Sequence, residues 1–282
     1  MYTIAAAQMA PNDERIDVNV QRMCRMMDLA KARHVDLLAF PELALTPYFA
    51  IAYRRDFARY FVSDDSKPIA LLRQKAQALR MNVMFGYAEV CQNAYYNAAM
   101  LIDRTGRIAL KYRKVHLPAP MIGPALSNYE RILFCPGDLG YPVAHIDGLC
   151  VGIQICYDRH FPEGYRTMAV HGADLICNLT ATTSLGERWR SEVWNLLLRA
   201  RAFENGVFVM GVNKSGPECG KDYYGNSMIV SPIGPEILAL AEQSDTDTLL
   251  VHAIDPADCA QARLRLPFIR DLSERERAFY QG

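Results

Sequence analysis

The sequence has no excess of charge of either sign and no dense block of lysine or arginine. Its 282 residues include 31 basic and 31 acidic side chains, which gives a formal net charge of zero. Proteins that bind nucleic acids draw their affinity from clustered cations that face the phosphates. We therefore expect no nucleic-acid partner.

The sequence also lacks long apolar runs. None approaches the roughly 20 residues that a helix needs to cross a bilayer. Residues 1–5 (MYTIA) lack the basic start and the apolar stretch of a signal peptide. These absences predict a cytoplasmic protein that has no membrane partner.

Cysteine and histidine are present but unclustered. The eight cysteines include no C-x-x-C pair, and the six histidines form no H-E-x-x-H or H-x-H pattern. Reduced thiols are the default in such a sequence, and its spacings do not support a dedicated zinc site. We expect neither a bound metal nor a cofactor.

Apolar segments of strand length recur along the whole chain, and amphipathic helical patterns separate them. Several of these segments hardly alternate with polar residues, which is typical of strands that are covered on both faces. The predicted strands are Ile4–Met9, Leu37–Phe40, Val83–Val90, Asn97–Ile102, Cys150–Cys156, Leu175–Leu179, Val207–Val212, Ser227–Val230 and Thr248–Ile254. The predicted helices are 16–30, Ile69–Leu79, Pro162–His171 and Glu192–Glu204.

The alternation of strands and helices predicts a mixed α/β fold, with hairpin signals at 103–106 and 231–234. No linker rich in serine and glycine divides the chain, so we expect residues 1–282 to form a single domain. The longest loop-like stretch is Pro118–Asp138. A loop of that length in a compact domain is usually functional.

Three segments carry residues that are suited to chemistry. The first is a short apolar strand that ends in Pro41 and Glu42. Ligands of α/β sheets bind beyond the carboxyl ends of the strands, so Glu42 lies where a general base is useful. The simpler alternative is a glutamate near the start of a helix, where it interacts with the helix dipole.

The second segment is KYRKVHL, residues 111–117, immediately before the long loop. If it is extended, Lys111 and Arg113 share one face while Tyr112 and Lys114 share the other. An inward lysine beside carboxylates can stabilise a developing oxyanion and tune a nearby thiol. The alternative is a solvated basic edge strand.

The third segment surrounds Cys156, which ends a predicted buried strand shortly before Pro162 and Glu163 open a helix. Cys156 thus lies at a strand-to-helix elbow. Backbone N–H groups of such a turn can hold an oxyanion, and nearby positive charge favours the thiolate over the thiol. The alternative is an inert core cysteine, because cysteine is among the most buried residue types.

In combination and in this order, the three segments resemble the nitrilase superfamily of carbon–nitrogen hydrolases. Members of that superfamily share Glu, Lys and Cys signatures at comparable spacing. The resemblance extends from residues 6–8 (AAQ) to residues 224–234 (YGNSMIVSPIG). It implies a four-layer αββα sandwich.

The resemblance also implies roles for individual residues. It makes Glu42 the general base, Lys114 the lysine that stabilises the oxyanion, and Cys156 the nucleophile. Glu130, aligned through the nearby residues 136–138 (PGD), matches a second glutamate that is common in the active sites of this superfamily.

These groups predict a hydrolysis in two steps through a thioester. Glu42 accepts the proton of Cys156 as the sulfur attacks a carbonyl carbon. The Lys114 ammonium and the Tyr157 backbone N–H stabilise the oxyanion, and Glu42 then activates the water that hydrolyses the thioester. The expected partner is therefore a small molecule with an amide or ureido group.

Residues 156–162 (CYDRHFP) suggest the class of substrate. They look like the C-Y-x-R-H-x-P segment of β-ureidopropionases and are similar to the arginine-bearing segment of N-carbamoyl-amino-acid hydrolases. Both groups release ammonia and carbon dioxide from ureido acids. Arg159 can bind a substrate carboxylate through a two-pronged contact. The alternative for Arg159 is an ion pair with Asp158, Glu163 or a partner helix.

Two further residues are candidates for substrate binding. His160 stands where the D-carbamoylase pattern has a second arginine, so we do not expect a preference for D-amino acids. Trp189, with Arg190 and Trp194, is a candidate for lining the acyl pocket. The alternative for a tryptophan pair on a helix is packing alone.

The resemblance also bears on assembly, because members of the superfamily commonly dimerise by stacking helices. It makes Pro162–His171 and Glu192–Glu204 the expected interface of a homodimer or a higher homo-oligomer. We expect the C-terminal tail, from about residue 256, to dock on the partner subunit, with Leu272 and Phe279 on one face. A solvated terminal helix is the alternative.

Other functions agree with parts of the pattern. An ω-amidase or aliphatic amidase would use the same residues, with Arg159 binding a distal carboxylate or only the scaffold, and a true nitrilase would act on nitriles. A catalytically silent binding or scaffold protein would have no chemical need for all four of Glu42, Lys114, Glu130 and Cys156. A Cys–His protease would need an oriented histidine, and no histidine has a supporting motif.

Overall fold

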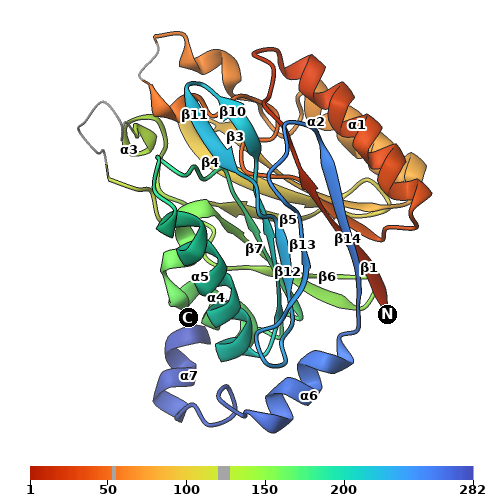
Figure 1. Cartoon of the computed structure of the whole chain (residues 1–282), viewed down its shortest axis with the longest axis vertical. Coiled ribbons are helices and arrows are strands. Elements are labelled where there is room, and N and C mark those ends of the chain that lie inside the picture. The colour runs from red at the N-terminus through yellow and green to blue at the C-terminus, as the bar shows by residue number, and fades with distance from the viewer. Residues whose placement is uncertain (53–54, 120–127, 282) are drawn as a thin grey trace.

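The computed structural model describes residues 1–52, 55–119 and 128–281. Two six-stranded sheets face each other in it (Figure 1). The first has the strand order β14-β1-β2-β3-β4-β5 and contains β1 (Tyr2–Gln8), β2 (Leu37–Ala39), β3 (Asn82–Cys91), β4 (Ala94–Ile102), β5 (Ile108–Arg113) and β14 (Thr248–Ile254). The second has the order β13-β12-β9-β8-β7-β6 and contains β6 (Val143–Ile146), β7 (Leu149–Ile155), β8 (Leu175–Leu179), β9 (Phe208–Val212), β12 (Met228–Val230) and β13 (Ile237–Leu240).

Helices cover the outer face of each sheet. Helices α1 (Ile16–Ala32) and α2 (Lys67–Leu79) pack on the first sheet, and α4 (Pro162–Val170) and α5 (Trp189–Asn205) pack on the second. The prediction of a four-layer αββα sandwich is therefore confirmed. Among the described residues, no helix combines the length and the apolar character that crossing a bilayer requires.

The remaining elements are short or lie near the C-terminus. They are the 3₁₀ helices η1 (Phe49–Ile51), η2 (Phe57–Tyr60) and η3 (Cys156–His160), helix α3 (Glu130–Leu133), the hairpin of β10 (Ser215–Glu218) and β11 (Lys221–Tyr224), and the helices α6 (Ala257–Arg265) and α7 (Glu274–Gln281). Helix α7 packs against α4 of the same chain, and Phe279 on α7 is 77% exposed.

The central strands of both sheets are buried because each has a packed layer on either side. Side chains such as Ala39, Tyr112 and Ile153 form one core between the two sheets. Two further cores lie under the helices of the outer layers. This explains why the predicted strands are apolar runs without alternation.

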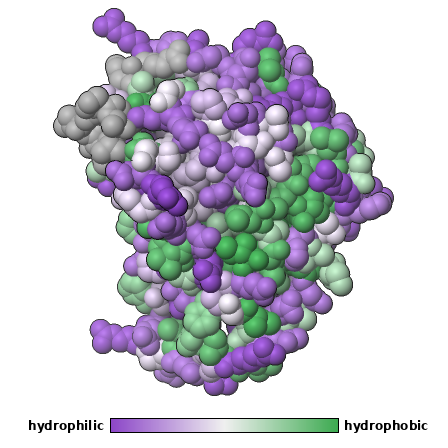
Figure 2. Space-filling model, in the orientation of Figure 1, coloured by the Kyte–Doolittle hydropathy of each residue, from purple (hydrophilic) through white to green (hydrophobic). Residues whose placement is uncertain are grey.

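The edge strands β13 and β14 of the two sheets lie side by side. Apolar side chains gather over them on the face that Figure 2 shows. Leu238, Leu249 and Val251 are half-buried there, and Leu240 is exposed.

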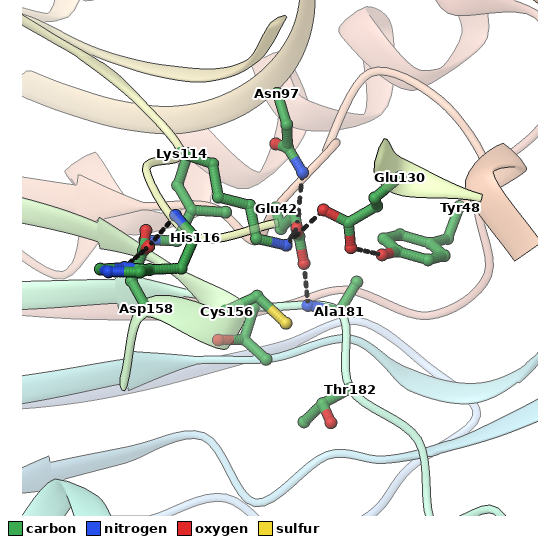
Figure 3. A network of polar contacts seen from close by, with 12 residues as sticks. Glu42, Tyr48, Asn97, Lys114, His116, Glu130, Cys156, Asp158, Ala181 and Thr182 are labelled. Carbon is green, nitrogen blue, oxygen red and sulfur yellow. Dashed lines mark hydrogen bonds and ion pairs between the residues drawn. The ribbon is translucent and has the colours of Figure 1, made fainter. Parts of the chain in front are cut away.

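Strand direction brings the chemically important segments to one edge of the sandwich. Strand β2 runs parallel to β3, and β5 is related to β3 by two antiparallel pairings, so β2 and β5 point the same way. Glu42 and Lys114 therefore both follow carboxyl ends at the same edge. Cys156 follows β7 of the facing sheet and approaches them across the gap between the sheets (Figure 3).

Several local predictions differ from the structure. Glu42 lies in a turn and not at a helix start, so the helix-dipole alternative is wrong. Strand β7 ends at Ile155, and Cys156 already belongs to η3. Strands β5, β6, β10, β11 and β13 are not among the predicted strands. Strand β5 is interrupted by the charged residues Lys111 and Arg113, and the other four are short and carry no long apolar run. Part of the predicted loop Pro118–Asp138, residues 120–127, lies outside the described residues.

Candidate active site

Glu42 is held in place from three sides. Its side chain is completely buried after β2. Its Oε1 accepts hydrogen bonds from Asn97 Nδ2 at 2.7 Å and from Lys114 Nζ at 2.8 Å, and its Oε2 accepts one from the backbone N–H of Ala181 at 2.9 Å (Figure 3). Both oxygens are thus oriented by donors from the two facing sheets.

The backbone around Glu42 is equally constrained. Leu43, the next residue, has a left-handed conformation with φ of 49°, which is costly for a branched side chain. A Cβ added to Gly86 on β3 would lie 2.7 Å from the Glu42 Cα. The glycine at this position therefore lets the turn that carries Glu42 pack directly on β3.

Lys114 bridges the two glutamates. It follows β5, its side chain is buried, and its Nζ lies 2.8 Å from Glu42 Oε1 and 2.7 Å from Glu130 Oε2. Burial opposes the charged form, but the negative charges of Glu130 and Glu42 outweigh it and raise the pKa of Lys114 above its ordinary value. The ammonium therefore stays charged. The alternative of a solvated lysine at this position is wrong.

Glu130 begins α3 and is also buried. Its second carboxylate oxygen accepts a hydrogen bond from the hydroxyl of Tyr48, and its backbone N–H donates to Asn128 Oδ1 at 2.9 Å. The structure thus joins Tyr48, Glu130, Lys114 and Glu42 in one continuous hydrogen-bonded row (Figure 3).

Cys156 lies at the elbow between β7 and α4, with φ of 45°. Its sulfur lies on the side of the site that carries Glu42 and Ala181, and the residue is 9% exposed (Figure 3). Burial, followed by the negative charge of Glu42, raises the pKa of the thiol to about 11 against the opposing charges of Lys114 and Arg159. Lys114 and Arg159 do favour the thiolate, as expected, but burial and the charge of Glu42 outweigh them, so the thiol is protonated at rest.

The elbow also presents a backbone donor. Tyr157 is the second residue of η3, and N–H groups in the first turn of a helix have no acceptor inside the helix. Asp158, the next residue, faces away from the sulfur. Its carboxylate accepts from the Tyr112 hydroxyl at 2.8 Å and from the His116 backbone N–H at 2.9 Å, which ties the elbow to the segment that carries Lys114.

A cavity of about 250 Å³ opens above Glu130 and Cys156. Glu42 and Lys114 are not part of its wall and lie beneath it, linked through the Lys114–Glu130 ion pair. Residues of the wall include Tyr48, Asn128, Glu130, Cys156, Tyr157, Arg159, His160, Thr182, Trp189, Arg190, Lys221 and Tyr223. The volume is close to the lower end of the range for small-molecule sites, roughly 300 Å³.

Arg159 is a buried cation in this wall without an acidic partner. Its Nη1 donates to the Cys156 carbonyl at 2.8 Å and lies 3.6 Å from the Cys156 sulfur. Within the described parts of the chain, no carboxylate lies within ion-pair distance of its guanidinium, and its Nε has no hydrogen-bond partner. The alternatives of ion pairs with Asp158 or Glu163 are therefore wrong.

The other predicted substrate-binding residues differ in their surroundings. His160 lies at the rim, where desolvation and the charges of Arg159 and Arg190 lower its pKa to about 4, so its ring is neutral at physiological pH. Trp189 begins α5, lines the cavity and is 53% exposed. Trp194 does not line the cavity: it is buried under α5, where its Nε1 donates to the Asn226 carbonyl at 2.8 Å.

Some polar contacts of the site escaped prediction from the sequence. Asn97, Tyr48 and the Ala181 N–H orient the two glutamates, yet none belongs to a recognisable motif. For Asn97 the sequence offered one signal: it is an amide inside an otherwise apolar strand, and a buried amide needs hydrogen-bond partners. Among the described residues, no group of three or more His, Cys, Asp and Glu side chains is arranged to hold a metal ion.

Comparisons find similar proteins over most of the chain. The sequence model of the carbon–nitrogen hydrolase family matches residues 3–264. N-carbamoylputrescine amidase from Oryza sativa is 30% identical over 89% of this chain and 85% of its own length, and citrullinase from Francisella tularensis is 28% identical over 95% and 94%.

A solved structure has the same fold. A mutant of an amidase from Nesterenkonia sp. AN1 is 26% identical, with a TM-score of 0.78 over 96% of this chain and 97% of that one. In that structure the acetamide moiety of fluoroacetamide is covalently added at the active-site cysteine.

Proposed function

Since the chain belongs to the carbon–nitrogen hydrolase family and is a hydrolase of carbon–nitrogen bonds other than peptide bonds, we propose that its substrate is an N-carbamoyl amino acid or a related ureido acid. The products are ammonia, carbon dioxide and the free amino acid. Cys156, Glu42, Lys114 and Glu130 carry out the chemistry in this proposal.

The first half of the reaction forms a thioester. The Cys156 thiol is neutral at rest because its pKa is raised to about 11, so its proton must leave during the attack. Glu42 accepts that proton while the sulfur bonds to the ureido carbon. The Lys114 ammonium and the Tyr157 N–H stabilise the oxyanion. Glu42 returns the proton to the terminal nitrogen, and the carbon–nitrogen bond breaks to release ammonia.

The second half consumes water and restores the enzyme. Glu42 takes a proton from water, and the resulting hydroxide attacks the carbamoyl thioester. The carbon–sulfur bond breaks and the sulfur regains a proton. The released carbamic acid separates into carbon dioxide and an amine, so one water is consumed and no redox step occurs. Glu130 keeps Lys114 oriented and charged throughout.

The unpaired guanidinium of Arg159 is the observation that carries the choice of substrate. A buried charge is costly unless it is paired, so this group favours a ligand with a carboxylate. Because Arg159 Nη1 lies 3.6 Å from the sulfur, a carboxylate bound there is only a few bonds from the attacked carbon. That spacing favours α- and β-ureido acids over longer ones.

The charge of the cavity also distinguishes between the known relatives. Carbamoylputrescine ends in an amine, which Arg159 and Arg190 would repel. Within the part of the chain that the structure describes, Arg190 also lines the cavity without an acidic partner. Citrulline also carries an ammonium, but its carboxylate can pair with Arg159, so by charge citrullinase is the relative whose substrate chemistry agrees better. Its ureido group is farther from the carboxylate than the spacing above favours.

Ammonia release from a panel of substrates tests the proposal. The panel contains N-carbamoyl-β-alanine, N-carbamoyl-α-amino acids, citrulline, carbamoylputrescine, glutaramate and simple aliphatic amides. We expect the highest kcat/KM for the carbamoylated α- and β-amino acids, and no turnover by Cys156→Ala with any of them. Faster turnover of carbamoylputrescine or of neutral amides would refute the choice of substrate.

An ω-amidase or aliphatic amidase is the second candidate. The structural similarity to the Nesterenkonia amidase supports it, because that protein holds a small acyl group at its cysteine. The same panel separates the two, since an ω-amidase turns over glutaramate and leaves the ureido acids intact.

For assembly, we propose that the chain forms a homodimer through α4 and α5, with the tail from about residue 256 at the interface. Leu196 on α5 is 63% exposed and Phe279 on α7 is 77% exposed, which supports a partner on this side. Leu196→Glu should shift the protein from dimer to monomer in light scattering. An unchanged mass would contradict this interface.

A further inference from the structure

A second buried ion pair lies outside the substrate cavity. It joins Lys214, which follows β9, to Glu218 at the end of β10, with Lys214 Nζ at 2.9 and 3.2 Å from the two carboxylate oxygens. The side chains are 1% and 3% exposed. Burying two charges costs free energy unless further hydrogen bonds satisfy both groups. The groups that supply those hydrogen bonds therefore show what the pair interacts with.

The pair satisfies the backbone of one particular loop. Glu218 Oε1 accepts from the backbone N–H of Tyr48 at 2.7 Å, and Lys214 Nζ donates to the carbonyl of Thr46 at 3.1 Å. Glu218 Oε2 accepts from the backbone N–H of Asn12 at 2.7 Å. The Asn12 amide in turn donates to the carbonyls of Leu43, Ala44 and Thr46.

The loop, residues 43–48, connects the proposed general base to a residue that orients the second glutamate. Glu42 immediately precedes it, and Tyr48 at its end donates to Glu130. The loop is a turn without sheet pairing and begins with the strained Leu43. A backbone without a regular ladder takes its position from whatever satisfies its polar groups. Here Asn12, Lys214 and Glu218 supply the contacts described above. The Leu45 carbonyl accepts from Asn19, and the Ala44 N–H donates to the Gly86 carbonyl.

We propose that Lys214 and Glu218 are positioning residues for the hydrolysis, acting through the loop 43–48 on Glu42 and on the Tyr48–Glu130 contact. This inference rests on the proposed roles of Glu42 and Glu130. The pair sets the direction of the general base relative to the sulfur, although neither of its side chains touches the substrate. Their charges matter because a carboxylate can accept from the backbone of Asn12 and Tyr48 at once.

The test compares Glu218→Gln with the double variant Lys214→Met/Glu218→Gln. Glutamine has one carbonyl oxygen where glutamate has two, so it cannot accept from both backbone N–H groups and Lys214. Displacing a catalytic group by about 1 Å can cost roughly 100-fold in rate. We expect kcat to fall about 10- to 100-fold in Glu218→Gln, with KM nearly unchanged because Arg159 is untouched.

The double variant separates positioning from mere stabilisation. It removes the unpaired lysine charge, so the melting temperature should rise relative to Glu218→Gln, while kcat stays low because the loop still lacks its acceptors. If the double variant recovers both its melting temperature and its kcat relative to Glu218→Gln, the proposal is overturned. Glu218→Asp, which keeps the charge, should recover part of the lost kcat, and failure to do so would also count against it.

A matched control removes another ion pair nearby. Asp247 pairs with Arg22 and accepts from the backbone N–H of Ala10 at 3.0 Å, but its contacts do not reach the loop 43–48. Asp247→Asn should lower stability and leave kcat of the folded protein unchanged. An equal loss of kcat in this control would show that general loosening, and not positioning, explains the Glu218 result.

A substrate-free readout keeps this test independent of the choice of substrate. Because the charge of Glu42 raises the pKa of Cys156, moving Glu42 away should shift the pH profile of iodoacetamide alkylation at Cys156 to lower pH. We expect that shift in Glu218→Gln and not in Asp247→Asn. An unchanged profile together with unchanged kcat would refute the proposal, even if the substrate is not a ureido acid.

Discussion

Removing the charge of Glu42 should make Cys156 easier to alkylate while it stops catalysis. Burial raises the pKa of the thiol to about 11, and the next largest cause is the negative charge of Glu42, while Lys114 and Arg159 act in the opposite direction. Glu42→Gln keeps the shape of the side chain and removes that charge. The pKa of Cys156 should therefore fall, and the thiolate fraction at neutral pH should rise.

The size of the effect follows from two opposing terms. A like charge within a few ångströms shifts a pKa by about 1–3 units. Each unit multiplies the thiolate fraction about tenfold but lowers the nucleophilicity of the thiolate about threefold. The alkylation rate at a fixed pH below the pKa should thus rise about 3-fold for one unit and about 40-fold for three units. Turnover should fall by at least about 100-fold, the usual contribution of a general base.

The assay measures alkylation of Cys156 by iodoacetamide across the neutral and alkaline range, with mass spectrometry to separate it from the other cysteines. Glu130→Gln should give a smaller increase, because Glu130 contributes least among the named charges. Lys114→Met should give a decrease. If Glu42→Gln lowers alkylation and turnover in parallel, Glu42 already activates the thiol at rest, and the reasoning is refuted.

Three other perturbations test separate parts of the site. Arg159→Gln should lower kcat/KM for carboxylate-bearing substrates by about 10- to 100-fold, because it removes a charge-assisted hydrogen bond to the carboxylate. An equal loss for neutral amides would contradict the proposed role of Arg159 in binding that carboxylate. Because the pKa of His160 is lowered to about 4 from 6.5, KM should show no transition near 6.5, and a wild-type transition there that His160→Gln removes would be the contrary result. Gly137→Ala would place a Cβ 2.0 Å from the carbonyl oxygen of Arg113, the residue before Lys114. The free energy of unfolding measured with urea should therefore fall by about 3 kcal/mol or more. An unchanged free energy of unfolding would show that the backbone moves to accommodate the methyl group.

The strands and helices that build the layers were predictable because their signals are local. An apolar run such as Leu175–Leu179 needs cover on both faces wherever it lies in the chain, and a stripe such as that of 16–30 needs one sheet beneath it. Pro41 marks the end of the strand before Glu42, and Pro162 marks the start of the helix after Cys156. Both residues were therefore predicted to lie where a strand ends. Short strands such as β6 and β10 have too few residues to show a period.

The partners of the catalytic groups were not predictable because they come from remote segments. Asn97, Tyr48 and Ala181 contact their glutamates across 55, 82 and 139 residues of chain. Such pairings depend on how the two sheets stack, which no local pattern specifies. The loop 43–48 is likewise held by Glu218, which lies 170 residues from Tyr48 along the chain.

The amino-acid order by itself indicated a mixed α/β fold and three segments suited to chemistry, because hydrophobic periodicity and turn chemistry act over a few residues. The four layers and the roles of the acid, the lysine and the thiol came from the resemblance of these segments to the carbon–nitrogen hydrolases. Only the tertiary structure decided which of these groups are protonated and which charges are paired. Burial, followed by the charge of Glu42, keeps the Cys156 thiol protonated at rest, and Arg159 has no ion pair with Asp158, whose carboxylate faces Tyr112 and His116. Charge interactions depend on distance and burial, and packing alone sets both.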